Sequence, residues 1–267
     1  MFTYFGYGSN INLISLRAKG VDPISSERGL LRGWRLRFNV QHWFQHEGGV
    51  GNIEPSPDAN DFVEGMVHTC RDEHLASLDA MEAYGVGYDR IEVDLETDHG
   101  RVKAFAYIGL PAFLDDSCLP TRRYLNIILK GAEAAGLSKA YIDKLRQHPI
   151  HIAEEYPEFE YPSGQEAVFT EQTLAAYPYL TVLAGAVFDM RSARSQLDSL
   201  ARLVGGKDMT LFYLKRHDSS DGTETLDDVI QGRISPEGKK YLNAYLHAYA
   251  REFKYAGRYV YHDPLRE

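Results

Sequence analysis

Alternation of apolar and polar residues dominates the first half of the chain and predicts short strands. In the segment 34–41, Trp34, Leu36 and Phe38 share one face, with Val40 beyond them. The same pattern predicts strands over 1–5, 34–41, 48–53, 62–69, 88–95 and 102–109. Five or six strands that are this short and this closely spaced indicate a small closed or nearly closed barrel.

Helical periodicity interrupts these strands and becomes prominent in the second half. In the first half, helices are predicted over 11–19, 72–84, 121–135 and 138–147. Later helices are predicted over 171–176, 192–204 and 236–254, and strands over 180–190 and 209–215. The last helix carries an aromatic stripe at i+4 spacing, typical of a domain core or of a contact between chains: Tyr241, Tyr245, Tyr249 and Phe253.

An acidic, proline-containing stretch separates the two halves. Residues 154–162 read Glu-Glu-Tyr-Pro-Glu-Phe-Glu-Tyr-Pro, which cannot form regular secondary structure throughout. We therefore expect a first domain over 1–153, a linker over 154–166 and a second domain over 167–267. The expected fold class is α+β, with a small mixed barrel of five or six strands, flanking helices and an α+β C-terminal extension.

Composition excludes several classes of function. The formal net charge of −9, with no segregated basic patch, argues against a nucleic-acid partner. The longest apolar run, 180–188, is about half of a membrane span, so no membrane association is expected. No signal peptide is expected ahead of the first strand. Cys70 and Cys118 do not make a disulfide framework, which indicates a reducing cytoplasm.

The run Gly6-Tyr7-Gly8-Ser9-Asn10 joins the first predicted strand to the first predicted helix. Glycines permit backbone angles and close approaches that other residues do not, and Ser9 and Asn10 are good helix N-caps. Such a loop presents N–H groups and the positive end of a helix dipole to an anion. A strand-turn-helix corner without a ligand explains it equally well, and the glycine spacing is not that of a dinucleotide-binding fold.

Glu82 is the acidic residue of the second predicted helix that we expect to point inward. Leu75, Leu78 and Met81 form the apolar face of that helix, and Glu82 projects about 20° from Leu75. Burial raises the pKa of a carboxyl group, and a carboxyl that titrates near neutral pH can act as a general acid or base. The alternative is that Glu82 reaches solvent or pairs with Arg90.

Other clusters of reactive residues carry weaker signals. His148 and His151 flank Pro149 and lack the partners of a zinc site, so no metal is expected. His68 and Cys70 share one face of a predicted strand, where a buried inert thiol is the more common outcome.

Two of these features occur together in one known family. The run 4–10, Tyr-Phe-Gly-Tyr-Gly-Ser-Asn, resembles the substrate loop of the γ-glutamylcyclotransferase family. The segment 78–82, Leu-Asp-Ala-Met-Glu, resembles the part that carries the family's catalytic glutamate. Residues 62–67 are similar to its central strand, and 120–145 are similar to its animal-type members. The resemblance covers residues 4–147 and leaves 167–267 unrecognised.

The resemblance implies an enzyme without metal or cofactor that converts a γ-glutamyl amino acid or amide into 5-oxoproline and releases the amino acid or amine. Glu82 matches the catalytic glutamate. The positions that match substrate-binding residues are Tyr4, Phe5, Gly6, Tyr7, Gly8, Ser9, Asn10, Tyr88 and Tyr124; Tyr107 is not included. The substrate's own α-amine attacks its γ-carbonyl, so one carboxyl group can take up a proton and later return it. The loop N–H groups can hold either the oxyanion or the substrate's α-carboxylate.

Two other functions stay open from the sequence. A non-catalytic protein would use the same barrel for binding or assembly, and a γ-glutamyl group could instead be removed from a specialised biosynthetic intermediate. The extension over 167–267 could cap the site, restrict substrate size, form a homodimer or carry an activity of its own. The partner that the resemblance implies is a small-molecule γ-glutamyl substrate.

Overall fold

The computed structural model describes residues 1–164 and 166–261. The chain divides into two compact units, and the first ends at Ala153 and the second begins at Glu154. Residue 165 of the predicted linker and residues 262–267 of the predicted second domain lie outside the described residues. The domain boundaries themselves stay a prediction. Within the described residues, no helix combines the length and the apolar character needed to cross a bilayer.

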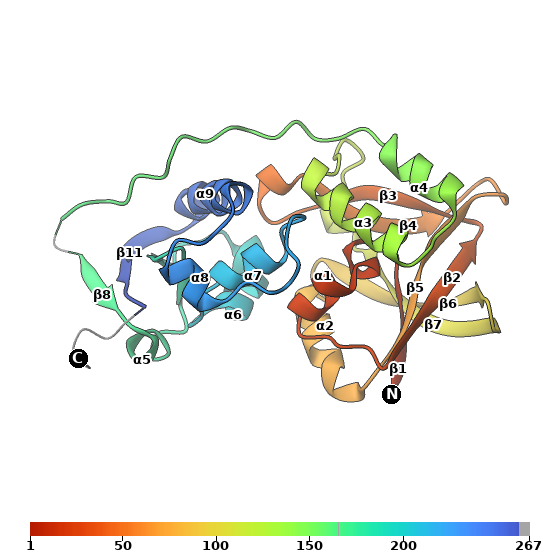
Figure 1. Cartoon of the computed structure of the whole chain (residues 1–267), viewed down its shortest axis with the longest axis horizontal. Helices are drawn as coiled ribbons and strands as arrows, with labels where there is room; N and C mark the ends of the chain where they lie inside the picture. Colours follow the sequence, from red (N-terminus) through yellow and green to blue (C-terminus); the bar gives the residue numbers. More distant parts are fainter. Residues whose placement is uncertain (165, 262–267) are drawn as a thin grey trace. The chain divides into compact units, whose positions relative to one another are not determined.

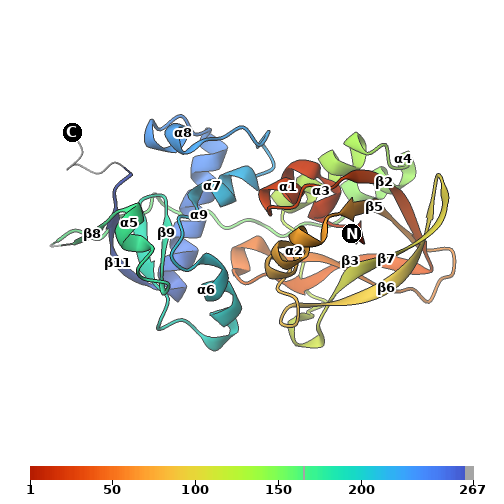
Figure 2. The same cartoon turned by 90° about the horizontal axis from the view of Figure 1, so that it is seen from below.

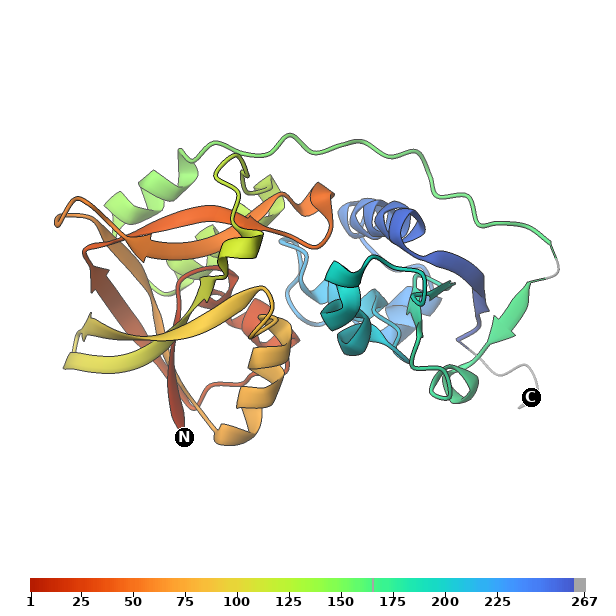
Figure 3. The ribbon, with the colours of Figure 1, turned by 180° about the vertical axis from the view of Figure 1, so that it is seen from behind.

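The first unit is built on a closed five-stranded barrel with the strand order β1-β5-β2-β6-β7 (Figure 1). The strands are β1 (Phe2–Gly6), β2 (Ser25–Arg32), β5 (Phe62–Cys70), β6 (Tyr88–Thr97) and β7 (Gly100–Gly109). Neighbours pair antiparallel, except that β1 and β7 close the barrel in parallel. The predicted small mixed barrel is therefore confirmed. Figure 3 shows β6 and β7 as one long hairpin along it.

The barrel uses a different set of strands from the predicted one. The predicted strands over 34–41 and 48–53 form a separate two-stranded sheet of β3 (Trp34–Gln41) and β4 (Gly49–Pro55). Their place in the barrel is taken by β2, which the sequence did not predict because polar residues and Gly29 weaken its strand signal. Gly29 is required there, since a Cβ at this position would lie 2.6 Å from Cγ2 of Val67.

Four α-helices flank the barrel of the first unit: α1 (Leu13–Ala18), α2 (Leu75–Met81), α3 (Arg122–Ala134) and α4 (Lys139–Arg146). The first begins later than predicted, because Ser9–Ile11 form a 3₁₀ turn and Asn12 is the N-cap instead of Ser9 or Asn10. Figure 2 shows α1 beside α3. Gly131 of α3 permits this contact, since a Cβ there would lie 2.6 Å from the backbone nitrogen of Asn12.

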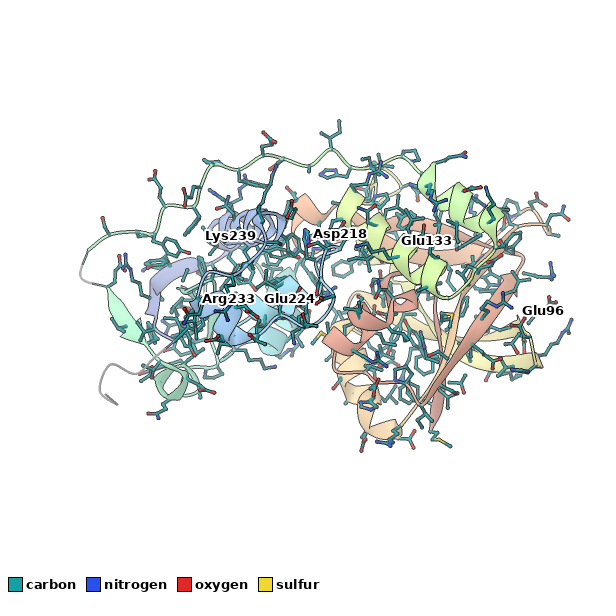
Figure 4. All side chains as sticks on the ribbon, viewed as in Figure 1. Glu96, Glu133, Asp218, Glu224, Arg233 and Lys239 are labelled. Atoms are coloured by element: carbon teal, nitrogen blue, oxygen red, sulfur yellow. The ribbon has the colours of Figure 1, made fainter. Side chains whose placement is uncertain are left out.

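Apolar side chains fill the barrel, and charged side chains cover its outside. Fully buried residues of its core include Phe5, Val63, Leu95 and Ala106. Figure 4 shows Glu96 at the end of the β6–β7 hairpin and Glu133 on α3, both on the outer surface. They pair with Arg32 and Arg146 respectively, and exposed pairs of this kind contribute about 0–1 kcal/mol each.

The second unit is an α+β arrangement, as predicted for the extension. Its four-stranded sheet has the order β8-β11-β10-β9, formed by β8 (Ala167–Phe169), β9 (Leu180–Leu183), β10 (Ala186–Asp189) and β11 (Lys254–Tyr259). Its helices are α5 (Glu171–Leu174), α6 (Asp198–Val204), α7 (Thr210–Lys215), α8 (Leu226–Ile230) and α9 (Pro236–Glu252).

Two predictions about this unit are wrong in detail, and three of its elements were not predicted. The single strand predicted over 180–190 is the hairpin of β9 and β10, turned at Ala184 and Gly185, whose φ angles are 47° and 82°. The strand predicted over 209–215 is the helix α7, because a short apolar run fits either state and packing on α9 decides it. The strands β8 and β11 and the helix α8 were not predicted.

The aromatic stripe of α9 is packing surface inside its own unit. Tyr245, Tyr249 and Phe253 are all buried, and the ring of Tyr245 lies 3.8 Å from the ring of Tyr213 on α7. The stripe therefore supplies the core of this unit, and the homodimer expected through the C-terminal domain stays a prediction.

Residues 156–159 of the predicted linker pack along α9 without regular secondary structure. The amide of Asn243 donates to the carbonyl oxygen of Pro157 at 2.8 Å, and its Oδ1 accepts from the backbone of Phe159 at 2.8 Å. His247 lies 2.9 Å from the same Pro157 oxygen and stacks on Tyr156. Residues 156–159 are thus part of the second unit.

Candidate active site

The loop after β1 folds back so that Asn10 lies against the second half of that strand. The carbonyl oxygens of Gly8 and Ser9 accept from the backbone N–H groups of Ile11 and Asn12, at 3.0 and 3.1 Å, which winds the 3₁₀ turn. Asn10 is buried, and its Nδ2 donates to the hydroxyl of Tyr4 at 2.6 Å. The predicted loop therefore turns its polar side chain inward.

Glu82 follows the last residue of α2 and points into the same region. Its side chain is 14% exposed, and its Oε1 accepts from Nδ2 of Asn10 at 2.9 Å and from Nζ of Lys19 at 2.7 Å. The alternative pairing of Glu82 with Arg90 is wrong, since Arg90 approaches Asp79 at 3.6 Å instead. The Glu82 side chain therefore points inward, as the helical periodicity of the sequence predicted.

Backbone geometry at the end of α2 aims Glu82. Ala83 has a φ of 49°, a left-handed conformation that ends the helix, and the N–H of Tyr84 donates back to the carbonyl oxygen of Asp79 at 2.9 Å. This hydrogen bond belongs to the Schellman type of helix ending. Glu82 thus leaves the helix as its C-cap residue, at a fixed angle to the barrel.

Four predicted tyrosines surround this carboxylate as neutral phenols. Tyr4, Tyr7 and Tyr124 are buried, and Tyr88 is half-buried. Burial is the main reason that the pKa of each lies above its ordinary value, and the negative charge of Glu82 raises the pKa of each further. All four therefore keep their protons near neutral pH and can donate hydrogen bonds.

Gly51 of β4 forms a wall of the site that the sequence did not identify. Its N–H donates to the hydroxyl of Tyr124 at 3.1 Å, and its carbonyl oxygen accepts from the hydroxyl of Tyr88 at 2.7 Å. A Cβ on Gly51 would lie 3.1 Å from the Tyr124 hydroxyl, and a Cβ on Gly8 would lie 3.0 Å from it. Hydrogen bonds from Ser9 also reach that hydroxyl and oppose the rise of its pKa.

Tyr107, which the resemblance did not assign, joins the site through Asp79. Its hydroxyl donates to Oδ1 of Asp79 at 2.6 Å, and its carbonyl oxygen accepts from the hydroxyl of Tyr7. Burial, then the bond to Asp79, raises the pKa of Tyr107. The side chain of Phe5 is fully buried in the barrel core, where it packs near Val67, and its expected part in substrate binding stays a prediction.

Two further polar residues of the site were missed as site residues. Lys19 is 4% exposed and contacts both Asn10 and Glu82. Its spacing of three from the buried Leu16 is a helical signal that could have identified it. His68 is fully buried; instead of contacting Cys70 it lies 2.9 Å from the carbonyl oxygen of Asn10.

Among the residues that the structure describes, no group of three or more His, Cys, Asp or Glu side chains is placed to hold a metal ion. Lys19 occupies the position next to Glu82 where a cation would bind. The arrangement suits proton transfer by one carboxylate, with phenol and backbone donors around it.

Comparison with known proteins gives consistent matches to the first unit. The model of the AIG2-like family matches residues 62–145. The γ-glutamylcyclotransferase of Homo sapiens is 30% identical over 153 residues, covering 54% of this chain and 77% of the human protein. That of Mus musculus is 29% identical over 150 residues, with the same coverages.

One solved structure covers a similar share of this chain. A crystal structure of an uncharacterised protein from Homo sapiens is 28% identical, has a TM-score of 0.51, and covers 58% of this chain and 92% of that chain. The family-model match lies within the barrel unit, as do the loop and Glu82. From these matches, the chain belongs to the γ-glutamylcyclotransferase family and is an enzyme of that type.

Proposed function

We propose that this enzyme cyclises a γ-glutamyl amino acid or γ-glutamyl amide to 5-oxoproline and releases the amino acid or amine, with Glu82 as the general base and then the general acid. The observation that supports this most is the inward carboxylate of Glu82, fixed 2.9 Å from the amide of Asn10 within the loop of the family resemblance. Its neighbours are neutral phenols, which can orient a polar substrate without competing for its proton.

The reaction moves two protons from the substrate's α-nitrogen to the departing nitrogen. The α-ammonium gives its first proton to the Glu82 carboxylate, and the free amine attacks the γ-carbonyl carbon. The new C–N bond closes a five-membered ring, and the carbonyl oxygen becomes an oxyanion. Glu82 passes its proton to the departing nitrogen as the original C–N bond breaks and the oxyanion returns to a carbonyl. The carboxylate then takes the second proton from the ring nitrogen and gives it to the released amine, so that a neutral lactam and an ammonium leave. No protein nucleophile takes part, because the substrate supplies its own.

Backbone and hydroxyl donors of the loop after β1 and of α3 would bind the anionic groups. We assign this role to the N–H groups of the Gly6–Asn10 loop, with the hydroxyls of Ser9 and Tyr124. The substrate's α-carboxylate and the oxyanion are the two groups that such donors favour. The N–H of Gly51 donates to the hydroxyl of Tyr124, and the carbonyl oxygen of Gly51 accepts from the hydroxyl of Tyr88. These two hydrogen bonds fix the position of Tyr124.

We further propose that the reaction takes place in the cytoplasm. Cys70 and Cys118 are both free thiols, Cys70 buried and Cys118 partly so. A reducing compartment preserves such thiols.

The direct test is release of 5-oxoproline by the wild type and by Glu82→Gln. The panel is γ-glutamyl-alanine, γ-glutamyl-ε-lysine and glutathione. We expect the wild type to release 5-oxoproline from at least one compound, and Glu82→Gln to lose at least about 10²-fold in kcat, the scale of one general acid–base group.

Glu73→Gln is the matched control, because Glu73 is an exposed acid in the turn just before α2. It should retain wild-type rates. Full activity of Glu82→Gln would exclude Glu82 as the base. Inactivity of the wild type on the whole panel would favour a specialised biosynthetic substrate or a binding role.

A further inference from the structure

Lys19 places a buried ammonium group directly on the carboxylate of Glu82. Nζ lies 2.7 Å from Oε1, and the two side chains are 4% and 14% exposed. Removing two charges from water costs several kcal/mol per ion, and apolar residues of similar volume often stabilise a fold as well or better. Packing between α1 and α2 therefore does not require a lysine at this position. The positive charge of Lys19 must have another role.

Asn10 fixes the ammonium and the carboxylate relative to each other. Its Oδ1 accepts from Nζ of Lys19 at 2.7 Å, and its Nδ2 donates to Oε1 of Glu82 at 2.9 Å. The three side chains form a closed triangle of hydrogen bonds. The backbone of Asn10 is held in turn, because its carbonyl oxygen lies 2.9 Å from Nε2 of the buried His68.

We propose that Lys19 is a positioning residue for the cyclisation, which keeps Glu82 ionised before reaction and promotes the return of the proton to the departing nitrogen. The proposal rests on the function proposed above. An adjacent ammonium favours the charged form of a carboxylate, which is the form that must accept a proton from the substrate's α-ammonium. Once protonated, a carboxyl group beside a cation is a stronger acid, so it gives the proton up more readily.

The attraction between the Lys19 ammonium and the Glu82 carboxylate also makes Glu82 a weaker base. Lys19 therefore affects both the reaction rate and the pH range over which the enzyme is active. Lys19 exchanges no proton in this scheme, and each proton that leaves the substrate's α-nitrogen passes to Glu82 and then to the leaving group. Without the ammonium, Glu82 would hold its proton to higher pH, and the free enzyme would lose its base on the acid side of the profile.

The phenols and the histidine around Glu82 hold their charge states over the range of interest. Those facing it are the phenols of Tyr4, Tyr7, Tyr88, Tyr107 and Tyr124, whose pKa values burial raises. Asp79 pairs with Arg90 and Tyr107. Burial lowers the pKa of His68 to about 4, so this histidine is neutral above about pH 5. A shift in the acid limb of the kcat/KM profile against pH therefore reports on the ionisation of Glu82.

The test compares Lys19→Gln, which keeps a hydrogen-bond donor but no charge, with Lys19→Arg, which keeps the charge. We expect the acid limb of the kcat/KM profile to move up by about one pH unit in Lys19→Gln, so that at pH values below both limbs the variant is about tenfold slower than the wild type. Lys19→Arg should keep the wild-type limb. Lys139→Met is the matched control, because Lys139 is an exposed residue of α4 that pairs with Asp143.

An unchanged acid limb in Lys19→Gln would overturn the proposal, whether or not the rate falls, since a purely structural role lowers rates without moving the limb. If Lys19→Gln does not fold, the wild type decides by carboxyl ¹³C NMR. The Glu82 resonance, assigned by its loss in Glu82→Gln, should keep the shift of an ionised carboxylate down to about pH 5. Loss of that shift above about pH 6 would also overturn it.

The two proposals fail in different ways. If the wild type releases no 5-oxoproline from any compound, the proposed function fails, while the NMR titration still tests the effect of Lys19 on Glu82. If the wild type is active and Lys19→Gln has a wild-type profile, only the role of Lys19 is lost.

Discussion

Replacing the buried His68 with glutamine should make the first unit less sensitive to acid. His68 is fully buried on β5, 2.9 Å from the carbonyl oxygen of Asn10 and 2.8 Å from the hydroxyl of Ser26. A carbonyl oxygen can only accept a hydrogen bond, so Nε2 carries the hydrogen and Nδ1 accepts from Ser26. Adding a second proton would reverse the bond with Ser26, whose hydroxyl would then accept from Nδ1, and would bury a charge.

The size of the effect follows from the pKa of this ring. Burial lowers the pKa of His68 from 6.5 to about 4, although the bond to Asn10 acts in the opposite direction. Between these values the unfolded chain binds the proton and the folded chain does not, so the free energy of unfolding falls as the pH falls. The stabilisation is fully present above pH 6.5. About 2 kcal/mol of it is lost at pH 5 and about 3 kcal/mol below pH 4.

The assay is chemical denaturation of the full chain at pH 7.5 and at pH 5, followed by tryptophan fluorescence. Both tryptophans, Trp34 and Trp43, lie in the first unit, so their emission follows the unfolding of that unit. Glutamine keeps a donor for Asn10 but does not titrate. We expect the wild type to lose about 2 kcal/mol more than His68→Gln between the two pH values.

His99→Gln is the matched control, since His99 is exposed in the turn between β6 and β7. It should lose as much stability as the wild type on acidification. Parallel losses in the wild type and His68→Gln would refute the reasoning, because they would mean that His68 takes up a proton without cost in the folded state.

Two other substitutions test the backbone geometry. Gly51→Ala would place a Cβ 3.1 Å from the Tyr124 hydroxyl, so we expect kcat/KM to fall at least about tenfold, or about 1.4 kcal/mol. Gly87→Ala, whose Cβ would meet only ordinary contacts, should keep its activity. Ala184→Asn in the β9–β10 turn replaces a residue with a φ of 47° by one that tolerates this conformation. It should stabilise the second unit by about 0.5–1 kcal/mol in calorimetry, whereas Ala184→Val should destabilise it.

The sequence by itself determined the features that local periodicity encodes. Alternation placed the strands at 34–41, 62–69 and 88–95 within a few residues of β3, β5 and β6. Helical spacing gave the inward direction of Glu82, because three apolar residues of one short helix define its buried face. These signals depend on neighbours within one or two turns of chain, which any sequence shows directly.

Tertiary structure alone decided which distant residues meet. The exclusion of β3 and β4 from the barrel, and the inclusion of β2, depend on pairings between segments far apart in the chain. The apolar run of the segment 210–215 fits either a strand or a helix, and packing on α9 decided that it forms the helix α7. At the site, Lys19 and Glu82 are 63 residues apart. Their contact arises because the barrel brings the ends of α1 and α2 together, and no pattern of spacing in the sequence records that distance.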